Sequence, residues 1–283
     1  MSYIRDDNST KRRIGMAITY VVLILFAILA IAPLVWLAIS SFKTSQDYQM
    51  NHLGLPKRWF YQNYIQAWKR GNFGIYIVNS VIYTACTTVA ILILSFMSGF
   101  AFSKIKSKAT KGIYGSYVIG ILMTLQSIMI PLFIVINQVG LYDTKLGVLI
   151  PYIGIGLPMG VYLATEYMRS IPGALVESAR LDGASYWCIF FSIIAPMSAP
   201  VGTTIAILQI SGTWNEFMLI NMLTSSKENK SLPVGIQSFA GSLSTDYGKL
   251  FASLMIGLIP MLIFYLVFRK EITKGVSAGA VKG

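Results

Sequence analysis

Residues 14–40 read IGMAITYVVLILFAILAIAPLVWLAIS, a stretch that contains no Asp, Glu, Lys or Arg. An α-helix rises 1.5 Å per residue, so about 20 apolar residues cross the hydrocarbon core of a bilayer. A signal peptide is also preceded by basic residues, here residues 11–13, but its apolar region has only about 7–15 residues. We therefore interpret this stretch as a retained membrane-spanning helix.

Five further stretches have comparable length and apolar character. They are residues 76–102, 113–139, 146–165, 193–223 and 250–268. Among these only the stretch 193–223 contains a charge, Glu216. The sequence therefore predicts an all-α integral membrane protein with six transmembrane helices within residues 14–268.

Composition agrees with a membrane protein. The 283 residues are 55% hydrophobic and only 12% charged, with a mean hydropathy of +0.63. A soluble domain has about 25% charged residues. The net charge of +12 does not indicate nucleic-acid binding, because no basic helix face or aromatic–basic platform is evident. One histidine and two distant cysteines argue against a zinc site, a His-based triad and a disulfide framework.

Basic residues give the orientation. Tight clusters at 11–13 and 104–111 both fall at ends of apolar stretches on the same side of the predicted topology. Cytoplasmic loops are enriched in Lys and Arg. We therefore expect a cytoplasmic N-terminal segment at 1–13, a six-helix transmembrane domain at 14–268 and a cytoplasmic tail at 269–283.

The segment between the fourth and fifth predicted spans is the most informative. Residues 170–185 read SIPGALVESARLDGAS. We expect Ser170 to be an N-cap with Pro172 in the first turn, and Asp182-Gly183 to form a turn. A short amphipathic stretch at 186–191 then leads into the fifth span. An ordinary connector between spans could have the same helix–turn–helix pattern.

A family resemblance favours a more specific interpretation. Glu177-Ser178-Ala179, followed by Gly183 and then by Ile-Ile-Ala-Pro at 193–196, resembles the EAA loop of bacterial ABC import permeases. Ser178 replaces an Ala of the family pattern and Ala195 replaces a Leu, but the spacing is intact. The full spacing before the fifth span is far more specific than a lone Glu-x-Ala.

Further motifs resemble the carbohydrate permeases, specifically the shorter subunit of the maltose-type pair. The matching positions are Pro56, Trp59, Asn63 and Tyr64, then Asn79-Ser80, Trp214-Asn215-Glu216-Phe217, Leu232-Pro233-Val234-Gly235 and the tail 275–283. The resemblance covers nearly the whole chain. It implies the MetI-like permease core in the inner membrane of a bacterial cell and a sugar as substrate.

The resemblance also implies partners and contact residues. The chain would form a heterodimer with a second permease and bind two ATPase subunits and an extracellular solute-binding protein. The expected ATPase contacts are Glu177, Ser178, Ala179, Asp182, Gly183, Gly279, Lys282 and Gly283. The chain has no Gly-x-x-x-x-Gly-Lys-Ser/Thr phosphate loop. We therefore expect no enzyme activity, metal or cofactor of its own, with ATP and Mg bound by the ATPase subunits.

Polar residues inside the spans are candidates for the translocation pathway or a gate, because such groups are costly in a bilayer. Gln209, Thr213 and Glu216 follow an i, i+4, i+7 spacing that would place them on one helix face. Asn215 flanks them, and Gln126 lies in the third span. Their amides and carboxylate suit sugar hydroxyls, but an interhelical hydrogen-bond network is the alternative. For Glu216 we favour a gate or a structural role near the outer surface.

The loop between the fifth and sixth spans resembles the segment of maltose-type permeases that enters the binding protein's sugar cleft. Its candidate residues are Gly241, Ser242, Ser244, Asp246 and Tyr247. Their hydroxyls and carboxylate could compete for the donors that hold the sugar, and the Tyr247 ring could stack on it. The alternative is an ordinary solvated loop.

Other functions remain open at this point. The same machine could carry glycerol phosphate or a polyamine, although the spans hold no Lys or Arg for a phosphate and few acids for a polyamine. An ion-coupled secondary transporter would need no ATPase. A membrane enzyme is poorly supported, because no nucleophile, base and metal set converges.

Overall fold

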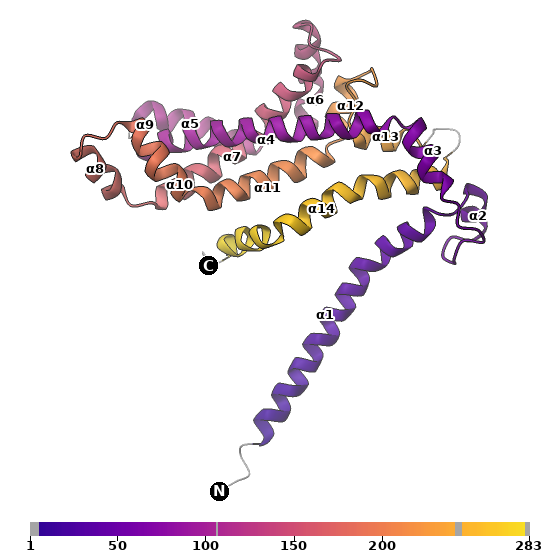
Figure 1. Cartoon of the computed structure of the whole chain (residues 1–283). Coiled ribbons are helices and arrows are strands. Elements are labelled where there is room, and N and C mark those ends of the chain that lie inside the picture. Colours follow the sequence, from indigo (N-terminus) through magenta and orange to yellow (C-terminus); the bar gives the residue numbers. More distant parts are fainter. Residues whose placement is uncertain (1–5, 106, 241–244, 281–283) are drawn as a thin grey trace. The chain divides into compact units, whose positions relative to one another are not determined.

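The computed structural model describes the backbone of residues 6–105, 107–240 and 245–280, and the side chains within residues 13–271. The described chain is almost entirely helical (Figure 1). Its helices are α1 (Asp6–Ser40), α2 (Ser45–Met50), α3 (Gln62–Arg70), α4 (Phe73–Lys104), α5 (Lys108–Ile121), α6 (Leu125–Gln138), α7 (Lys145–Ser170), α8 (Gly173–Leu181), α9 (Tyr186–Ile189), the π-helix η1 (Phe190–Ile194), α10 (Ala195–Met197), α11 (Ala199–Asn215), α12 (Met218–Leu223), α13 (Leu232–Gln237) and α14 (Tyr247–Ala280).

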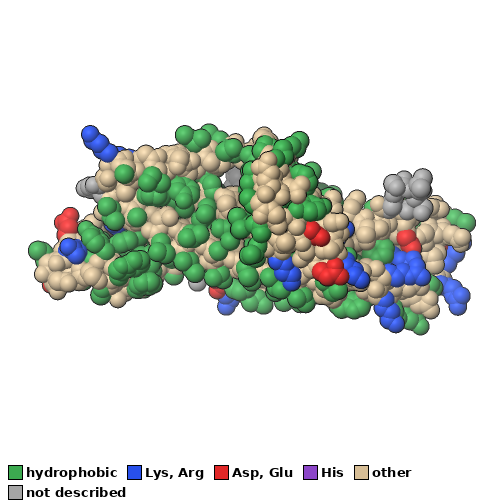
Figure 2. All heavy atoms as spheres, turned by 90° about the horizontal axis from the view of Figure 1, so that it is seen from above, with side chains coloured by type: hydrophobic (Ala, Val, Ile, Leu, Met, Phe, Trp, Pro, Cys, Tyr) green, Lys and Arg blue, Asp and Glu red, His purple; other side chains and the backbone are tan. Residues whose placement is uncertain are grey.

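Four helices are long and apolar enough to cross a membrane by themselves. They are Arg13–Ser40, Phe73–Lys104, Lys145–Ser170 and Tyr247–Glu271. Two further spans are bent pairs, Lys108–Ile121 with Leu125–Gln138 and Tyr186–Met197 with Ala199–Asn215. The described residues thus hold up to six spans, which agrees with the predicted number. Hydrophobic side chains cover much of the face that Figure 2 shows, as lipid contact requires.

The third and fifth spans are bent, a feature that the sequence did not predict. The third span bends by 107° between α5 and α6, where Thr124 adopts an extended backbone. The fifth bends by 71° at Ser198 and ends at Asn215. Pro196 and Pro200 flank that bend, and a proline lacks the N–H that an uninterrupted helix would use.

The chain forms two compact units, which are described separately. Unit 1 comprises residues 1–70 and 239–256, and unit 2 comprises residues 71–238 and 257–283. Unit 2 carries most of the candidate functional residues.

Unit 2 is built around the pair α4 and α7. Gly156 and Gly160 form a Gly-x-x-x-Gly pair on α7, and a Cβ on either would overlap side chains of α4, namely Ile91 and Ser95. On α4, a Cβ on Gly99 would overlap Ala164 of α7. Small residues let helix backbones approach closely in a membrane, where no hydrophobic force drives helices together. The two helices therefore form the rigid axis of the unit.

Three apolar clusters follow this axis. The central one consists of Ile91, Ala164, Val201 and Ile205. A second includes Phe100, Met168, Ile171, Ile189, Phe190 and Ile194, and we call its side of unit 2 the α8 end. The third includes Tyr83, Ile136, Val148, Tyr152, Leu219, Ile220, Leu223 and Val234, and we call its side the opposite end.

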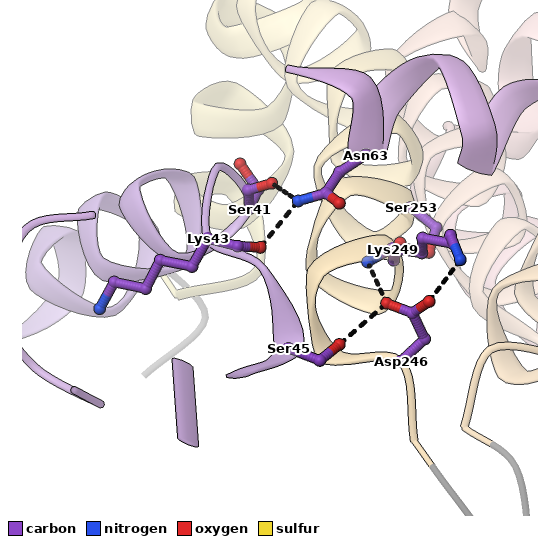
Figure 3. Close-up of polar contacts among 7 residues, drawn as sticks. All are labelled: Ser41, Lys43, Ser45, Asn63, Asp246, Lys249 and Ser253. Carbon is purple, nitrogen blue, oxygen red and sulfur yellow. Dashed lines mark hydrogen bonds and ion pairs between the residues drawn. The ribbon is translucent and has the colours of Figure 1, made fainter. Parts of the chain in front are cut away.

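Unit 1 joins the end of α1 to α2, α3 and the start of α14 (Figure 3). The Asn63 amide donates to the backbone oxygens of Ser41 and Lys43, both at 2.8 Å. The buried Lys43 Nζ in turn donates to the Asn51 carbonyl at 2.7 Å, just after α2. A Cβ on Gly248 would overlap the Lys43 carbonyl, so glycine allows α14 to approach this turn.

Candidate functional site

The motif-bearing segment is a short helix that lies outside the spans. α7 continues through Ser170, so our prediction of Ser170 as an N-cap was wrong; Pro172 occupies that position and α8 begins at Gly173. Its inner side chains, Val176 and Ala179, lie against the apolar cluster at the α8 end. Its outer side chains are exposed, including Glu177, Ser178 and Leu181, the last at 89%.

The turn after α8 forms where it was predicted. Gly183 has φ +81°, a left-handed conformation that favours glycine. The Ala184 N–H donates to the Ala179 carbonyl at 2.9 Å and closes the helix end. Asp182 at the C-cap is exposed, and the Ser185 hydroxyl then caps α9. The motif's Gly and Ala thus shape the segment, while Glu177, Ser178 and Asp182 face outward.

Lys104 holds the start of this segment. Its Nζ, at the end of α4, donates to the Ile171 carbonyl at 2.7 Å, just after α7. The last carbonyls of a helix lack intrahelical partners, so a lysine there satisfies one of them. From the sequence, Lys104 indicated only the orientation of the chain, because its hydrogen-bond partner is a backbone atom 67 positions away.

Glu166 is a second residue that sequence analysis missed. α7 is longer than predicted, so Glu166 lies within a span-forming helix, whereas the sequence placed no acid but Glu216 in a predicted span. The Glu166 carboxylate accepts from Tyr114 Oη at 2.6 Å and from Arg169 at 2.5 Å, and Arg169 lies over the Tyr114 ring. This cluster ties α5 to α7 near the α8 end.

The polar residues of the fifth span lie in the last turns of α11 and just beyond it. α11 ends at Asn215 and Glu216 is its C-cap residue, but Gln209 and Glu216 both contact α7, at Gly156 and Tyr152. Gln209 donates to the Gly156 carbonyl at 3.4 Å, an interhelical contact. Asn215 is exposed and bonds to Ser211 of its own helix.

Glu216 joins α7 to α12. Its carboxylate accepts from Tyr152 Oη at 2.6 Å and from the N–H groups of Leu219 and Ile220 at 2.7 and 3.1 Å. It therefore satisfies two free amides at the N-terminus of α12. Gln126 is exposed near the start of α6, and no hydrogen bond between described residues joins it to this group.

A network of hydrogen bonds around Asp143 holds the opposite end of unit 2 together. The Asp143 carboxylate accepts from the N–H groups of Ser225 and Ser226, from the Ser226 hydroxyl and from the Asn229 amide, at 3.0–3.3 Å. Burial alone would raise the pKa of Asp143, but these donors outweigh it and hold the pKa below its usual value. The backbone of Asp143 is in the left-handed region, with φ +56°.

Helix α4 holds the same loop from the other side. The Asn79 amide donates to the carbonyls of Glu228 and Lys230 at 2.7 and 3.0 Å, and Tyr83 Oη donates to the Asn229 carbonyl at 2.8 Å. The Ser80 hydroxyl accepts from the Leu232 N–H. The Asn79-Ser80 motif therefore has a structural role in this chain.

The candidate binding-protein loop is only partly described, because Gly241, Ser242 and Ser244 lie outside the described residues. Asp246 accepts from the Ser45 hydroxyl at 3.0 Å and pairs with Lys249, and these contacts outweigh burial to lower its pKa (Figure 3). The Tyr247 ring lies 4.9 Å from that of Tyr48. Both residues are thus engaged within unit 1.

The tail residues Lys282 and Gly283 also lie outside the described chain. Gly279 belongs to α14, so the predicted tail is helical as far as Ala280. Within the described residues, no three His, Cys, Asp or Glu side chains are grouped to bind a metal ion.

A chain with several candidate spans and a motif-bearing helix outside them belongs to the class of integral membrane proteins. The family model for the binding-protein-dependent transport system inner membrane component matches residues 91–269. The chain belongs to this family, which confirms the predicted recognition and fold.

Relatives match over nearly the full length. The chain is 34% identical over 281 residues to the probable ABC transporter permease protein YurM of Bacillus subtilis, covering 99% of this chain and 93% of that one. It is 31% identical to the diacetylchitobiose uptake system permease protein NgcG of Streptomyces coelicolor, covering 98% and 92%. It is 30% identical to the trehalose transport system permease protein SugB of Mycobacterium tuberculosis, covering 90% and 93%.

A solved structure shares the fold. A chain in the crystal structure of a bacterial ABC transporter that imports the acidic polysaccharide alginate superimposes with a TM-score of 0.79. The identity is 24%, and the match covers 95% of this chain and 99% of that one.

Proposed function

We propose that this chain is a permease subunit of an ATP-driven carbohydrate importer, and that α8 is its contact with the ATPase. The sugar assignment is supported by relatives named for diacetylchitobiose and trehalose uptake. The observation that carries the coupling proposal is the geometry of α8, a nine-residue helix with an apolar inner face, an exposed outer face and anchored ends.

A helix this short is marginal by itself, because isolated helices under about 12 residues are unstable in water. Val176 and Ala179 hold it on the apolar cluster, and Lys104 holds the segment at its start. The exposed Glu177 and Leu181 remain available to a partner. A helix that transmits motion from a partner must be fixed to its own chain on one face and accessible to the partner on the other, and α8 has both properties.

The polar side chains of α11 are the main candidates for the lining of the sugar translocation pathway. Gln209, Thr213 and Asn215 present amides and a hydroxyl suited to sugar hydroxyls, and Gln126 could add a further amide from α6. Glu216 has a different role in this proposal, because its contacts with Tyr152 and α12 make it a positioning residue. With its carboxylate engaged in this way, Glu216 is poorly placed to bind a cationic solute, which argues against a polyamine.

The proposed assembly has four kinds of protein. A second permease completes the membrane pore, two ATPase subunits bind ATP and Mg, and an extracellular solute-binding protein delivers the sugar. Both termini are cytoplasmic, and Gly279, Lys282 and Gly283 add a second ATPase contact. In this proposal, the loop that contains Gly241, Ser242, Ser244, Asp246 and Tyr247 binds the solute-binding protein.

Two substitutions test the coupling proposal. Glu177→Lys reverses the exposed charge, and Gly183→Asp strains the left-handed turn, so each should abolish sugar uptake while the chain still inserts. Glu228→Lys is the matched control, because Glu228 is an exposed acid at the opposite end. Normal uptake by both α8-end variants would refute the proposal, and analysis of the saccharide held by the copurified binding protein would identify the substrate.

A further inference from the structure

We propose that unit 1 carries a binding surface for the headgroups of anionic phospholipids. The surface, called here the α3 surface, consists of Lys57, Arg58, Trp59, Trp68, Lys69 and Arg70. It lies outside the segments that we assign to coupling and to the pathway. The occupant is the membrane surface itself.

The connection to α4 places α3 close to the bilayer surface. α3 ends at Arg70, and only Gly71 and Asn72 separate it from Phe73, where a candidate membrane span begins. Three residue steps of chain reach at most about 11 Å. The end of α3 therefore lies near the level at which phospholipid headgroups begin.

The inner face of α3 is fixed, which determines the face that it presents. The Asn63 amide holds the turn after α1 through two carbonyls, as Figure 3 shows, and Tyr64 Oη lies 2.6 Å from Ser41 Oγ. Ala67 is fully buried on the same side. Ile65 and Trp68, on other positions of the helix, are exposed. The surface is thus held in place before any lipid arrives.

The exposed aromatic residues suit a membrane interface. Trp59 is 58% exposed and Trp68 is 49% exposed. The Trp59 ring is held by an edge-on contact with Phe42, with centroids 5.3 Å apart. Tryptophan favours the headgroup level, because its ring has an apolar body and a polar N–H.

The charge pattern selects anionic lipids. Residues 48–142 contain no Asp or Glu, so no acid follows Asp47 on this segment. The Asp47 carboxylate accepts from the Lys57 backbone N–H at 3.1 Å, and the ion pairs at Arg169 and Lys249 include none of the cations of the α3 surface. Among the described residues, the four cations of this surface thus accompany two exposed tryptophans with no ion pair to an acid. Phosphate groups of lipids complement this pattern.

Fluorescence of the full chain in lipid nanodiscs tests the proposal. Nanodiscs would contain either brominated phosphatidylglycerol or brominated phosphatidylcholine, and Trp68 would be read as the difference between the wild type and Trp68→Phe. We expect stronger quenching of Trp68 by the anionic lipid. Lys69→Gln with Arg70→Gln should lower the preference for the anionic lipid by roughly fivefold or more.

A matched control removes the same charge elsewhere. Lys145→Gln with Lys227→Gln changes two exposed lysines at the opposite end of unit 2 and should leave Trp68 quenching unaltered. Equal quenching by both lipids, or equal loss in the control pair, would overturn the proposal. Absence of quenching by either lipid, with Trp68 shielded on addition of the binding protein, would assign the surface to a protein partner instead.

Discussion

The two ends of unit 2 differ in how they satisfy their own side chains. At the opposite end, Asp143, Asn79 and Tyr83 tie the loop after α12 to the rest of unit 2 by hydrogen bonds. At the α8 end, Glu177 and Leu181 are exposed and the segment is held mainly at its base. Hydrogen bonds therefore hold the loop of one end at several positions, whereas the other end leaves an apolar side chain and a carboxylate exposed.

The largest effect should come from the exposed leucine of α8. Leu181→Asp places a charge where we expect an apolar contact with the ATPase, and a buried leucine contributes about 1.5–3 kcal/mol. We expect roughly hundredfold weaker binding of the ATPase subunit, measured by titration of the purified proteins. Leu53→Asp is the control, because Leu53 is 87% exposed in unit 1. Unchanged binding would remove α8 as the contact.

The next largest effect, on stability, should come from the hydrogen-bond network around Asp143 at the opposite end. Asp143→Asn removes a charged acceptor, and hydrogen bonds to charged groups contribute about 1.5–3 kcal/mol. We expect the free energy of unfolding to fall by about 2 kcal/mol, seen as a lower thermal midpoint in detergent. Asp182→Asn, at an exposed acid of the α8 end, should leave the midpoint unchanged. An equal loss in both variants would contradict the comparison.

The same hydrogen-bond network predicts that the stability of the protein depends on pH. The folded-state pKa of Asp143 is lowered, so its stabilisation is complete above the pKa of the unfolded chain and is lost as the pH falls through the folded-state value. The stability gap between the wild type and Asp143→Asn should therefore shrink on acidification below about pH 4. A constant gap would show that the carboxylate charge is unimportant.

A smaller effect is expected at the base of the α8 segment. Lys104→Met removes the donor to the Ile171 carbonyl, and we expect roughly tenfold faster amide hydrogen exchange within residues 172–185. Lys104→Arg can still donate and should restore part of the protection. If exchange is unaltered in Lys104→Met, the segment does not depend on this anchor.

The smallest effect should come from the turn itself. Arg180 lies over the Tyr186 ring at 4.7 Å, and an exposed contact of this kind contributes about 0.5–1 kcal/mol. Tyr186→Leu should raise hydrogen exchange in the turn by about threefold. An effect as large as that of Lys104→Met would show that the turn, and not the base, holds the segment.

Sequence predicted the fold class and the motif-bearing segment well, because apolar length and motif spacing are local signals. The turn at Gly183 and the six candidate spans agree with the structure. Hydropathy did not predict the bends, because it carries no information about backbone conformation, such as the extended backbone at Thr124. The role of Lys104 and the contact of Glu216 with Tyr152 depend on partners far away in the sequence, so no local pattern could indicate them.

The bend between α5 and α6 has a consequence for the lipid environment. Leu122 is 80% exposed and Met123 is 59% exposed there, and Thr124 adopts an extended backbone conformation. α5 has 14 residues, about 21 Å of helix, so the interruption falls within the thickness of the hydrocarbon core if α5 runs along the membrane normal. Hydrocarbon offers no hydrogen bonds to interrupted backbone. In that orientation, the backbone groups that remain unpaired at this corner need another polypeptide or water as a partner.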